Sequence, residues 1–115
     1  MSLQLSYTVF ILDDAAQDLR NIHAYIQHQF SVSLANEISQ EIMDSILMLE
    51  INPFLGTTIP QLTALGMTDY RHMVIMNKNR VVYELDHKHT QIFVYLICNE
   101  RQDYDAVIQA RIFRQ

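Results

Sequence analysis

Turn-forming and cross-linking residues are scarce in this chain of 115 residues, which contains two glycines, two prolines, one cysteine and no tryptophan. Two glycines exclude a glycine-rich phosphate-binding loop, because such a loop needs several of them close together. The single cysteine, Cys98, cannot form an internal disulfide, and this favours a reducing compartment. Since Cys98 ends an apolar run, we interpret it as a small buried side chain.

Long apolar runs are missing as well. No run approaches the roughly 20 residues that cross a bilayer, and the first twelve residues lack the basic start of a secretory signal. Half of the residues are apolar and 18% are charged, which is the composition of a folded domain. We therefore expect a single domain over residues 1–115, located in the cytoplasm and without a membrane partner.

Positive charge is sparse and unevenly placed. Residues 1–70 carry eight acidic side chains and one basic side chain, whereas residues 71–115 carry seven basic and five acidic ones. The net charge of the whole chain is −5. A site for an anionic or acidic partner is therefore expected in the second half. Because an acidic chain binds a polyanion poorly at cellular salt, direct binding to nucleic acid is not expected.

The five histidines do not form a metal-binding pattern. His23 and His28 are five residues apart on a predicted helix, which puts them on different faces. His87 and His89 lie in a turn that has no cysteine and no repeated carboxylate spacing around it. Zinc sites need such spacing. The sequence therefore predicts no metal site and no cofactor.

Hydrophobic periodicity predicts a strand and a helix at the start of the chain. Residues 5–12 are β-branched and aromatic, with apolar side chains at both parities, which is typical of a strand covered on both faces. Apolar side chains then recur at spacings of three and four, which predicts a helix over about 14–30. Asp13 and Asp14 precede it as acceptors placed to cap the helix.

A second helix and a long loop follow. Ser31 or Ser33 can cap a helix that ends before Pro53, because proline pushes the preceding residue out of helical geometry. Two long helices with a short connection predict an antiparallel hairpin. Residues 52–69 have no period and contain both glycines and both prolines of the chain, and their apolar side chains indicate an ordered loop.

The remainder of the chain predicts a meander. Strand-like runs over 70–76, 80–86 and 91–98 are separated by short polar turns, and a short helix is expected after Asp103. The pattern βααβββ(α) predicts an α+β fold. Its two layers are a helical hairpin and a mainly antiparallel four-stranded sheet.

Arginine begins two of these strands, at Arg71 and Arg80. In an antiparallel pair their positions lie toward opposite ends, so a joint site requires a third element. Arg101, just past the last strand, is expected at the same edge as Arg80, with Lys78 in the adjacent turn. These three cations are the predicted contact for an anionic or acidic partner. The alternative, left open, is that each arginine pairs with a nearby acid: Glu84, Asp86, Glu100 or Asp103.

Several residues of the loop and the strands follow one another in a characteristic order. They are Pro53, Gly56, Pro60, Leu62 and Gly66, then "YR" at 70–71 and "RVVYEL" at 80–85, preceded by the helix "DDAAQDLRNIHAYI". Over about residues 7–103 the chain resembles the ParE/RelE superfamily of toxins from type II toxin–antitoxin systems, and it is nearer the ParE, or plasmid stabilisation, branch. It departs from the family at Asn99-Glu100-Arg101, where a histidine is often found two positions before the arginine.

The resemblance implies a βααβββ fold and a cognate antitoxin that neutralises the toxin. ParE-like toxins inhibit DNA gyrase, and RelE-like toxins cleave mRNA on the ribosome. We expect the gyrase-directed activity, which requires no catalytic residue of this chain. The alternatives are a metal-independent endoribonuclease and an inactive relic that only binds an antitoxin. With this resemblance, Lys78, Arg80 and Arg101 become the expected contact for a target or an antitoxin. The resemblance also marks structural positions: Pro53, Gly56, Pro60, Arg71 and Tyr83.

The ribonuclease alternative needs a base, an acid and cations around the scissile phosphate. Arg80 and Arg101 are the candidate phosphate ligands, and Glu84 is the catalytic candidate beside them. His72 and Tyr83 are further acid–base candidates. Strand alternation places Tyr83 and Glu84 on opposite faces, so these two side chains cannot easily act together.

Overall fold

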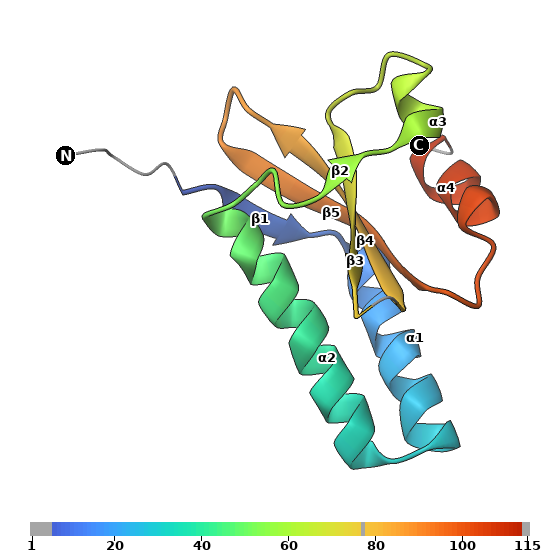
Figure 1. Cartoon of the computed structure of the whole chain (residues 1–115). Coiled ribbons are helices and arrows are strands. Elements are labelled where there is room, and N and C mark those ends of the chain that lie inside the picture. Colours follow the sequence, from blue (N-terminus) through green and yellow to red (C-terminus); the bar gives the residue numbers. More distant parts are fainter. Residues whose placement is uncertain (1–5, 77, 114–115) are drawn as a thin grey trace.

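The structure is a computed structural model that describes residues 6–76 and 78–113. Figure 1 shows a twisted sheet with a long helical hairpin on one side and two shorter helices on the other. The elements are, in order, β1 (Thr8–Ile11), α1 (Asp13–Gln29), α2 (Val32–Leu47), η1 (Met48–Glu50), β2 (Thr57–Thr58), α3 (Pro60–Thr63), β3 (Tyr70–Ile75), β4 (Asn79–Asp86), β5 (Gln91–Asn99) and α4 (Tyr104–Ile112).

The strands form one sheet in the order β1-β5-β4-β3-β2. β1 runs parallel to β5, and all other neighbours are antiparallel. The α+β prediction is confirmed. The two-residue strand β2 was not predicted, since it lies in the loop and pairs only with Arg71 and His72. The prediction that both faces of the first strand are covered is wrong. β1 is an edge strand, and its Phe10 is 41% exposed and stacks on Phe93.

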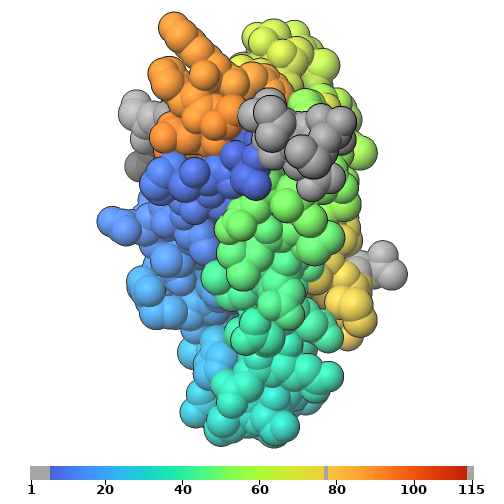
Figure 2. Space-filling view, turned by 90° about the vertical axis from the view of Figure 1, so that its left-hand side faces the viewer, coloured from blue at the N-terminus to red at the C-terminus, as the bar shows by residue number. Residues whose placement is uncertain are grey.

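The helical hairpin covers one face of the sheet and encloses the main core. Ile22 and Ile26 of α1, together with Ile42 and Ile46 of α2, point their apolar stripe at the strands. Figure 2 shows the two helices side by side along one side of the molecule. In Figure 1 the hairpin continues past the end of the sheet. Within the described residues, no helix has the length and apolarity required to span a membrane.

The two long helices begin differently. The N-cap of α1 is Leu12, which makes no side-chain bond, so the prediction that Asp13 and Asp14 cap this helix is wrong. Both carboxylates lie in the first turn instead, where negative charge is favourable. At α2, the Ser31 hydroxyl accepts a hydrogen bond from the Leu34 N–H at 3.0 Å. This confirms one of the two predicted caps.

α3 and α4 cover part of the opposite face and enclose a second, smaller core. A β-bulge in β5 changes which of the two cores its side chains enter. Val82 lies opposite Leu96 while the next residue, Tyr83, lies opposite Val94, so Tyr95 is the extra residue. Val94 consequently belongs to the main core and Leu96 to the second core.

Candidate functional site

The β3–β4 turn and the connection after β5 lie side by side at one end of the sheet. The Glu100 N–H, just after β5, donates a hydrogen bond of 2.8 Å to the carbonyl of Lys78 in the β3–β4 turn. Asn79 and Asn99 lie opposite each other at this same end. The bond brings the turn that carries Lys78 beside the connection that carries Arg101. This end of the sheet therefore gathers the three cations that the sequence singled out.

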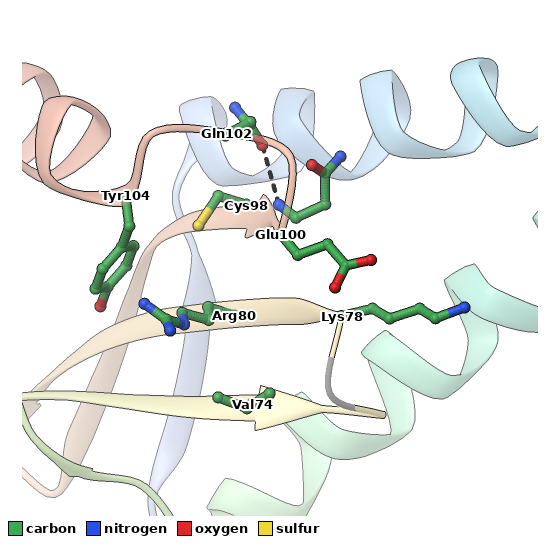
Figure 3. A pocket seen from close by; sticks show the side chains of 8 residues that line it. Val74, Lys78, Arg80, Cys98, Glu100, Gln102 and Tyr104 are labelled. Atoms are coloured by element: carbon green, nitrogen blue, oxygen red, sulfur yellow. Dashed lines mark hydrogen bonds between the residues drawn. The ribbon is translucent and has the colours of Figure 1, made fainter.

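Arg80 lines a small cavity on the face that α4 covers, here called the Arg80 cavity (Figure 3). Its guanidinium carbon lies 4.3 Å from the centre of the Tyr104 ring. The cavity has a volume of about 170 Å³, and its lining includes Val74, Lys78, Arg80, Cys98, Gln102 and Tyr104. The guanidinium has five N–H donors, so it can contact Tyr104 and still offer donors to a carboxylate or a phosphate.

His72 and Tyr104 form a polar pair beside Arg80. The His72 Nδ1 lies 2.6 Å from the Tyr104 hydroxyl, and the two rings are stacked. Burial, and then the positive charge of Arg80, lower the pKa of His72 below its usual value. Burial raises the pKa of the Tyr104 phenol above its usual value. At neutral pH the pair is therefore a neutral imidazole and a protonated phenol. The sequence singled out His72 but not Tyr104, whose only signal is its place at the start of the last helix.

Cys98 faces the same cavity but is 1% exposed. Burial raises the pKa of its thiol to about 11. The thiolate is the reactive form of cysteine, so the side chain is a thiol at neutral pH and packs as a small apolar group. The sequence-based interpretation of Cys98 is confirmed.

Arg101 lies on the other side of the sheet end, against the helical hairpin. Its guanidinium carbon is 3.5 Å from the centre of the Tyr25 ring in α1. Beside this stack opens a cleft of about 290 Å³ between the hairpin and the sheet end. We call it the hairpin cleft, and its lining includes Ile22, Tyr25, Ile26, Phe30, Leu34, Ile38, Lys78 and Arg101. Figure 3 shows Lys78 extending away from the Arg80 guanidinium. The three predicted cations thus share one end of the sheet but lie on two surfaces.

Glu84 lies four residues from Arg80 along β4, which is roughly 13 Å at the rise of a strand. Its carboxylate accepts a hydrogen bond from the Tyr95 hydroxyl at 3.2 Å. Tyr83 points into the main core on the opposite face, as strand alternation predicts. The three side chains proposed for ribonuclease chemistry, Arg80, Glu84 and Arg101, therefore do not line one cavity.

The arginines that begin β-strands or follow them stack on aromatic rings and do not pair with acids. Among the described residues the ion pairs are His89–Asp86 and Arg111–Asp18. None of the predicted alternatives with Glu84, Asp86, Glu100 or Asp103 is formed. The stacked pairs are Arg71 on Phe54, Arg80 on Tyr104, and Arg101 on Tyr25.

Arg71 and Tyr83 hold the long loop against the sheet. The Gly56 N–H donates to the Tyr83 hydroxyl at 2.8 Å, and this hydroxyl donates to the Pro53 carbonyl at 2.9 Å. Arg71 donates to the Gly56 carbonyl at 2.6 Å. A Cβ on Gly56 would lie 2.6 Å from the His72 carbonyl oxygen, so only glycine fits there.

Pro60 stands at the first position of α3, where its missing N–H costs no hydrogen bond. The resemblance marked Pro53, Gly56, Pro60, Arg71 and Tyr83 as structural positions. Each of them lies in this loop or holds the loop against the strands.

Sequence reasoning missed one ion pair that fastens α4. The Arg111 guanidinium donates to both carboxylate oxygens of Asp18 in α1. It also donates to the Tyr95 carbonyl at 3.1 Å, while the Ile97 N–H donates to Asp18 at 3.0 Å. β1 ends opposite Val94. Beyond that point, Asp18 and Arg111 provide β5 with hydrogen-bond partners that a longer β1 would have provided. No spacing in the sequence links residues so far apart.

No group of three or more histidine, cysteine, aspartate or glutamate side chains in the described part of the chain is arranged to hold a metal ion. The His89 Nδ1 lies 2.8 Å from a carboxylate oxygen of Asp86. His23 bonds to Asn36 of α2 at 2.9 Å and so joins the two helices of the hairpin.

A family model described as the ParE toxin of the type II toxin–antitoxin system parDE matches residues 9–104. No curated protein matches the chain significantly. The structure is similar to the chromosomal ParDE toxin–antitoxin system from P. aeruginosa, with 15% identity, a TM-score of 0.66, and coverage of 82% of this chain and 96% of that one.

Two further solved structures share the fold. A mutant of the E. coli toxin RelE in the free state is 13% identical, with a TM-score of 0.65 and coverage of 95% of this chain and 97% of that one. The toxin–antitoxin complex RelBE2 from Mycobacterium tuberculosis is 17% identical, with a TM-score of 0.53 and coverage of 83% and 99%. At these identities the likeness is one of fold. The family model, which spans most of the chain, carries the assignment.

Proposed function

Because the chain belongs to the ParE toxin family of type II toxin–antitoxin systems, we propose that it stops growth by inhibiting DNA gyrase and that a cognate antitoxin neutralises it. The observation that carries this proposal is the family match over residues 9–104. Such a pair would stabilise the plasmid or chromosomal segment that encodes it, and both proteins would act in the cytoplasm.

The charge of the chain supports a protein target over direct binding to nucleic acid. The net charge is −5, and a duplex-binding surface needs several cations that neutralise phosphates together. Arg80, Lys78 and Arg101 are instead distributed over two surfaces. Each guanidinium suits a single carboxylate, which is the contact expected with an acidic protein surface.

The test is induction of the protein in bacteria together with an assay on purified gyrase. A gyrase inhibitor induces the DNA-damage response, leaves mRNA intact, and yields linear plasmid DNA when gyrase is present. A matched reaction without gyrase should yield none. Growth arrest without DNA breaks, in cells whose transcripts are cleaved at ribosomes, would overturn the proposal.

A second function, cleavage of mRNA on the ribosome, is supported by the pair of His72 and Tyr104 beside Arg80. A neutral imidazole within hydrogen-bond distance of a phenol, next to the Arg80 guanidinium, combines acid–base groups with a phosphate ligand. Loss of transcript cleavage in His72→Gln and Arg80→Ala variants that remain folded would favour this function.

The third alternative, an inactive relic that only binds an antitoxin, predicts a different result. The induced protein would leave growth unchanged and still bind the product of the neighbouring gene. The same induction experiment therefore separates all three functions.

A further inference from the structure

We propose that the chain pairs with a second copy of itself along the open edge of β3, with Val74 at the centre of the contact, and that the two sheets become continuous. The inference goes beyond the proposed function and holds whether the target is gyrase or mRNA. It starts from a short stretch of β3 that has no neighbouring strand on its outer side in the described part of the chain.

β2 is the edge strand of the sheet, but it covers β3 only in part. Its two residues pair with Arg71 and His72. β3 continues to Ile75 without a further strand partner on that side among the described residues. Figure 1 shows the short arrow of β2 beside one end of the longer β3. Residues 73–75 therefore form an open strand edge.

The backbone of Val74 points outward at this edge. A Cβ on Gly56 would lie 2.6 Å from the His72 carbonyl oxygen, so that carbonyl points toward the loop and β2. The Ile75 carbonyl instead accepts a hydrogen bond from the Lys78 N–H in the β3–β4 turn. Backbone groups of successive residues in an antiparallel sheet alternate between the two sides of the strand. Val74 therefore presents its N–H and carbonyl to the open side, where no described residue bonds to them.

The open edge carries none of the charges that natural proteins use to protect such edges. A groove of about 440 Å³, here called the edge groove, runs along it. Its lining includes Ser45, Leu55, Thr57, Met73, Val74 and Ile75. No aspartate, glutamate, lysine or arginine of the described chain lines this groove. His72, which also lines it, is neutral at neutral pH because burial and the charge of Arg80 lower its pKa.

A second copy of β3 complements this edge. The sequence Met73-Val74-Ile75 is itself an apolar stretch that favours a strand, and an uncharged edge does not select a charged partner. In an antiparallel pair related by a twofold axis, a residue whose backbone points outward can lie opposite its own copy and exchange both hydrogen bonds with it. Val74 meets this condition.

The neighbouring registers are less suitable. A shift of one residue would turn the side chains of the two copies to opposite faces of the sheet. A shift of two residues would place Val74 opposite His72, which already pairs with β2, or opposite Met76, whose φ of 54° ends the extended backbone. The register that fits the edge therefore has Val74 opposite the second copy's Val74.

Pairing would also cover apolar surface beside the Arg80 cavity. The Val74 side chain is 51% exposed, and in the paired sheet the Cβ atoms of the two Val74 residues would lie roughly 5 Å apart. Val74 lies opposite Arg80 in β4 and lines its cavity (Figure 3). The second copy would therefore lie next to the surface that the proposed function assigns to Arg80.

Sedimentation velocity of the purified chain at roughly 1–200 µM tests the proposal, because short interfaces associate weakly. We expect a reversible equilibrium between monomer and dimer. Val74→Lys and Val74→Glu should each weaken the association at least about tenfold, since like charges directly opposite each other destabilise a strand pair. An equimolar mixture of Val74→Lys and Val74→Glu should restore association to within about threefold of the original chain, because opposite charges then face each other.

Two control variants separate edge pairing from other contacts. Thr8→Lys places the same charge at an exposed position of β1, the strand at the other edge of the sheet, and it should associate within about twofold of the original chain. Ile51→Ser changes an apolar side chain that is 62% exposed and does not line the edge groove, and it should behave in the same way. Thermal unfolding checks that every variant is folded.

Added salt gives an independent readout. The proposed interface is uncharged and each copy carries a net charge of −5, so salt should leave the association unchanged or strengthen it by screening the repulsion between copies.

The inference would be overturned by a chain that stays monomeric over the whole concentration range, by unchanged association of Val74→Lys, or by a mixture of Val74→Lys and Val74→Glu that stays monomeric. An equal loss in Ile51→Ser would also overturn it, because the contact would then lie on the apolar surface after α2. A chain that leaves gyrase unaffected yet dimerises in the expected pattern would overturn only the proposed function.

Discussion

At the scale of single residues, Arg71, Arg80 and Arg101 stack on aromatic rings and do not pair with nearby acids. A guanidinium over an aromatic ring is desolvated on one face and keeps its edge donors available. In Arg71 one such donor is used by the Gly56 carbonyl. Arg80 and Arg101 have the same stacked geometry but open on a cavity or a cleft. The same residue type thus has a structural role in one strand and is free to contact a partner at the other positions.

Arg71→Ala should therefore lower the free energy of unfolding by about 1–3 kcal/mol, because the buried side of the loop loses a charge-assisted bond. Tyr83→Phe should lower it by a similar amount, since the Gly56 N–H and the Pro53 carbonyl lose their shared partner. Arg80→Ala should unfold like the original chain and lose growth inhibition. Denaturant unfolding and growth curves for the three variants check this. If Arg80→Ala unfolds readily and toxicity follows only the folded fraction, its assignment to a functional site is wrong.

His72 should make folding sensitive to mild acid. Its pKa is lowered in the folded chain, so the unfolded chain binds the proton more readily. The contribution of His72 to stability is complete above the ordinary histidine pKa of about 6.5 and is lost as the pH falls below it. Unfolding measured at about pH 7.5 and about pH 5.5 should show a smaller difference for His72→Gln than for the original chain. His28→Gln, which changes an exposed histidine of α1, should keep the full difference.

At the scale of elements, an ion pair between Asp18 and Arg111 links α4 to α1 beside a small apolar core. Asp18 and Arg111 are largely buried, with 12% and 24% of their side chains exposed, and they also satisfy two backbone groups of β5. This ion pair lies where a continuation of β1 would otherwise pair with β5. This arrangement protects an open strand edge, which is a common site of unwanted pairing between chains.

Loss of the Asp18–Arg111 ion pair should lower the free energy of unfolding more than loss of a surface ion pair would. We expect Asp18→Asn and Arg111→Gln each to lower the free energy of unfolding by about 2–3 kcal/mol, because each leaves a partner and a backbone group unsatisfied. The double variant should lose less than the two single losses added together. His89→Gln removes an exposed pair and should change stability by less than about 1 kcal/mol. Strict additivity of the two single variants would show that the pair is not coupled.

Periodicity in the sequence predicts the long helices and the strands well, because each buries one face continuously over many residues. It does not predict β2, whose two threonines are placed by the loop anchors Pro53 and Gly56 and not by their own pattern. It also cannot show the bulge at Tyr95, which reverses the faces of the residues that follow. At the candidate site, Lys78, Arg80 and Arg101 are correctly expected at one end of the sheet. Their division between two surfaces depends on Tyr25 and Tyr104, which nothing in the sequence connects to them.

At the scale of the whole molecule, large apolar side chains remain exposed on one region. Five of them lie between the end of α2 and the start of β2, namely Leu47, Met48, Ile51, Phe54 and Leu55, and each is at least 44% exposed. An exposed apolar patch marks an interaction site or a tendency to aggregate, and these five side chains are candidates to form one. A bound antitoxin would account for it.

The chain expressed alone should therefore inhibit growth or accumulate as insoluble protein. Co-expression with the product of the upstream gene should cure both, because a bound segment covers apolar surface and blocks the site. Soluble yield and growth rate, measured with and without the upstream gene, check this. A matched co-expression with an unrelated small protein controls for expression load. Normal growth with abundant soluble monomer would contradict the assignment as an active toxin.

The parallel pairing of β1 with β5 has a consequence for synthesis of the chain. Thr8 lies opposite Gln91, and β1 has no other strand beside it. Chains grow on the ribosome at roughly 5–20 residues per second. The main core cannot form until β5 has been synthesised, because β1 and the helical hairpin pack against it. Arg80 acquires its cavity only when Tyr104 has also emerged. If Arg80 contacts the target as proposed, the growing chain stays inactive until translation has passed Tyr104.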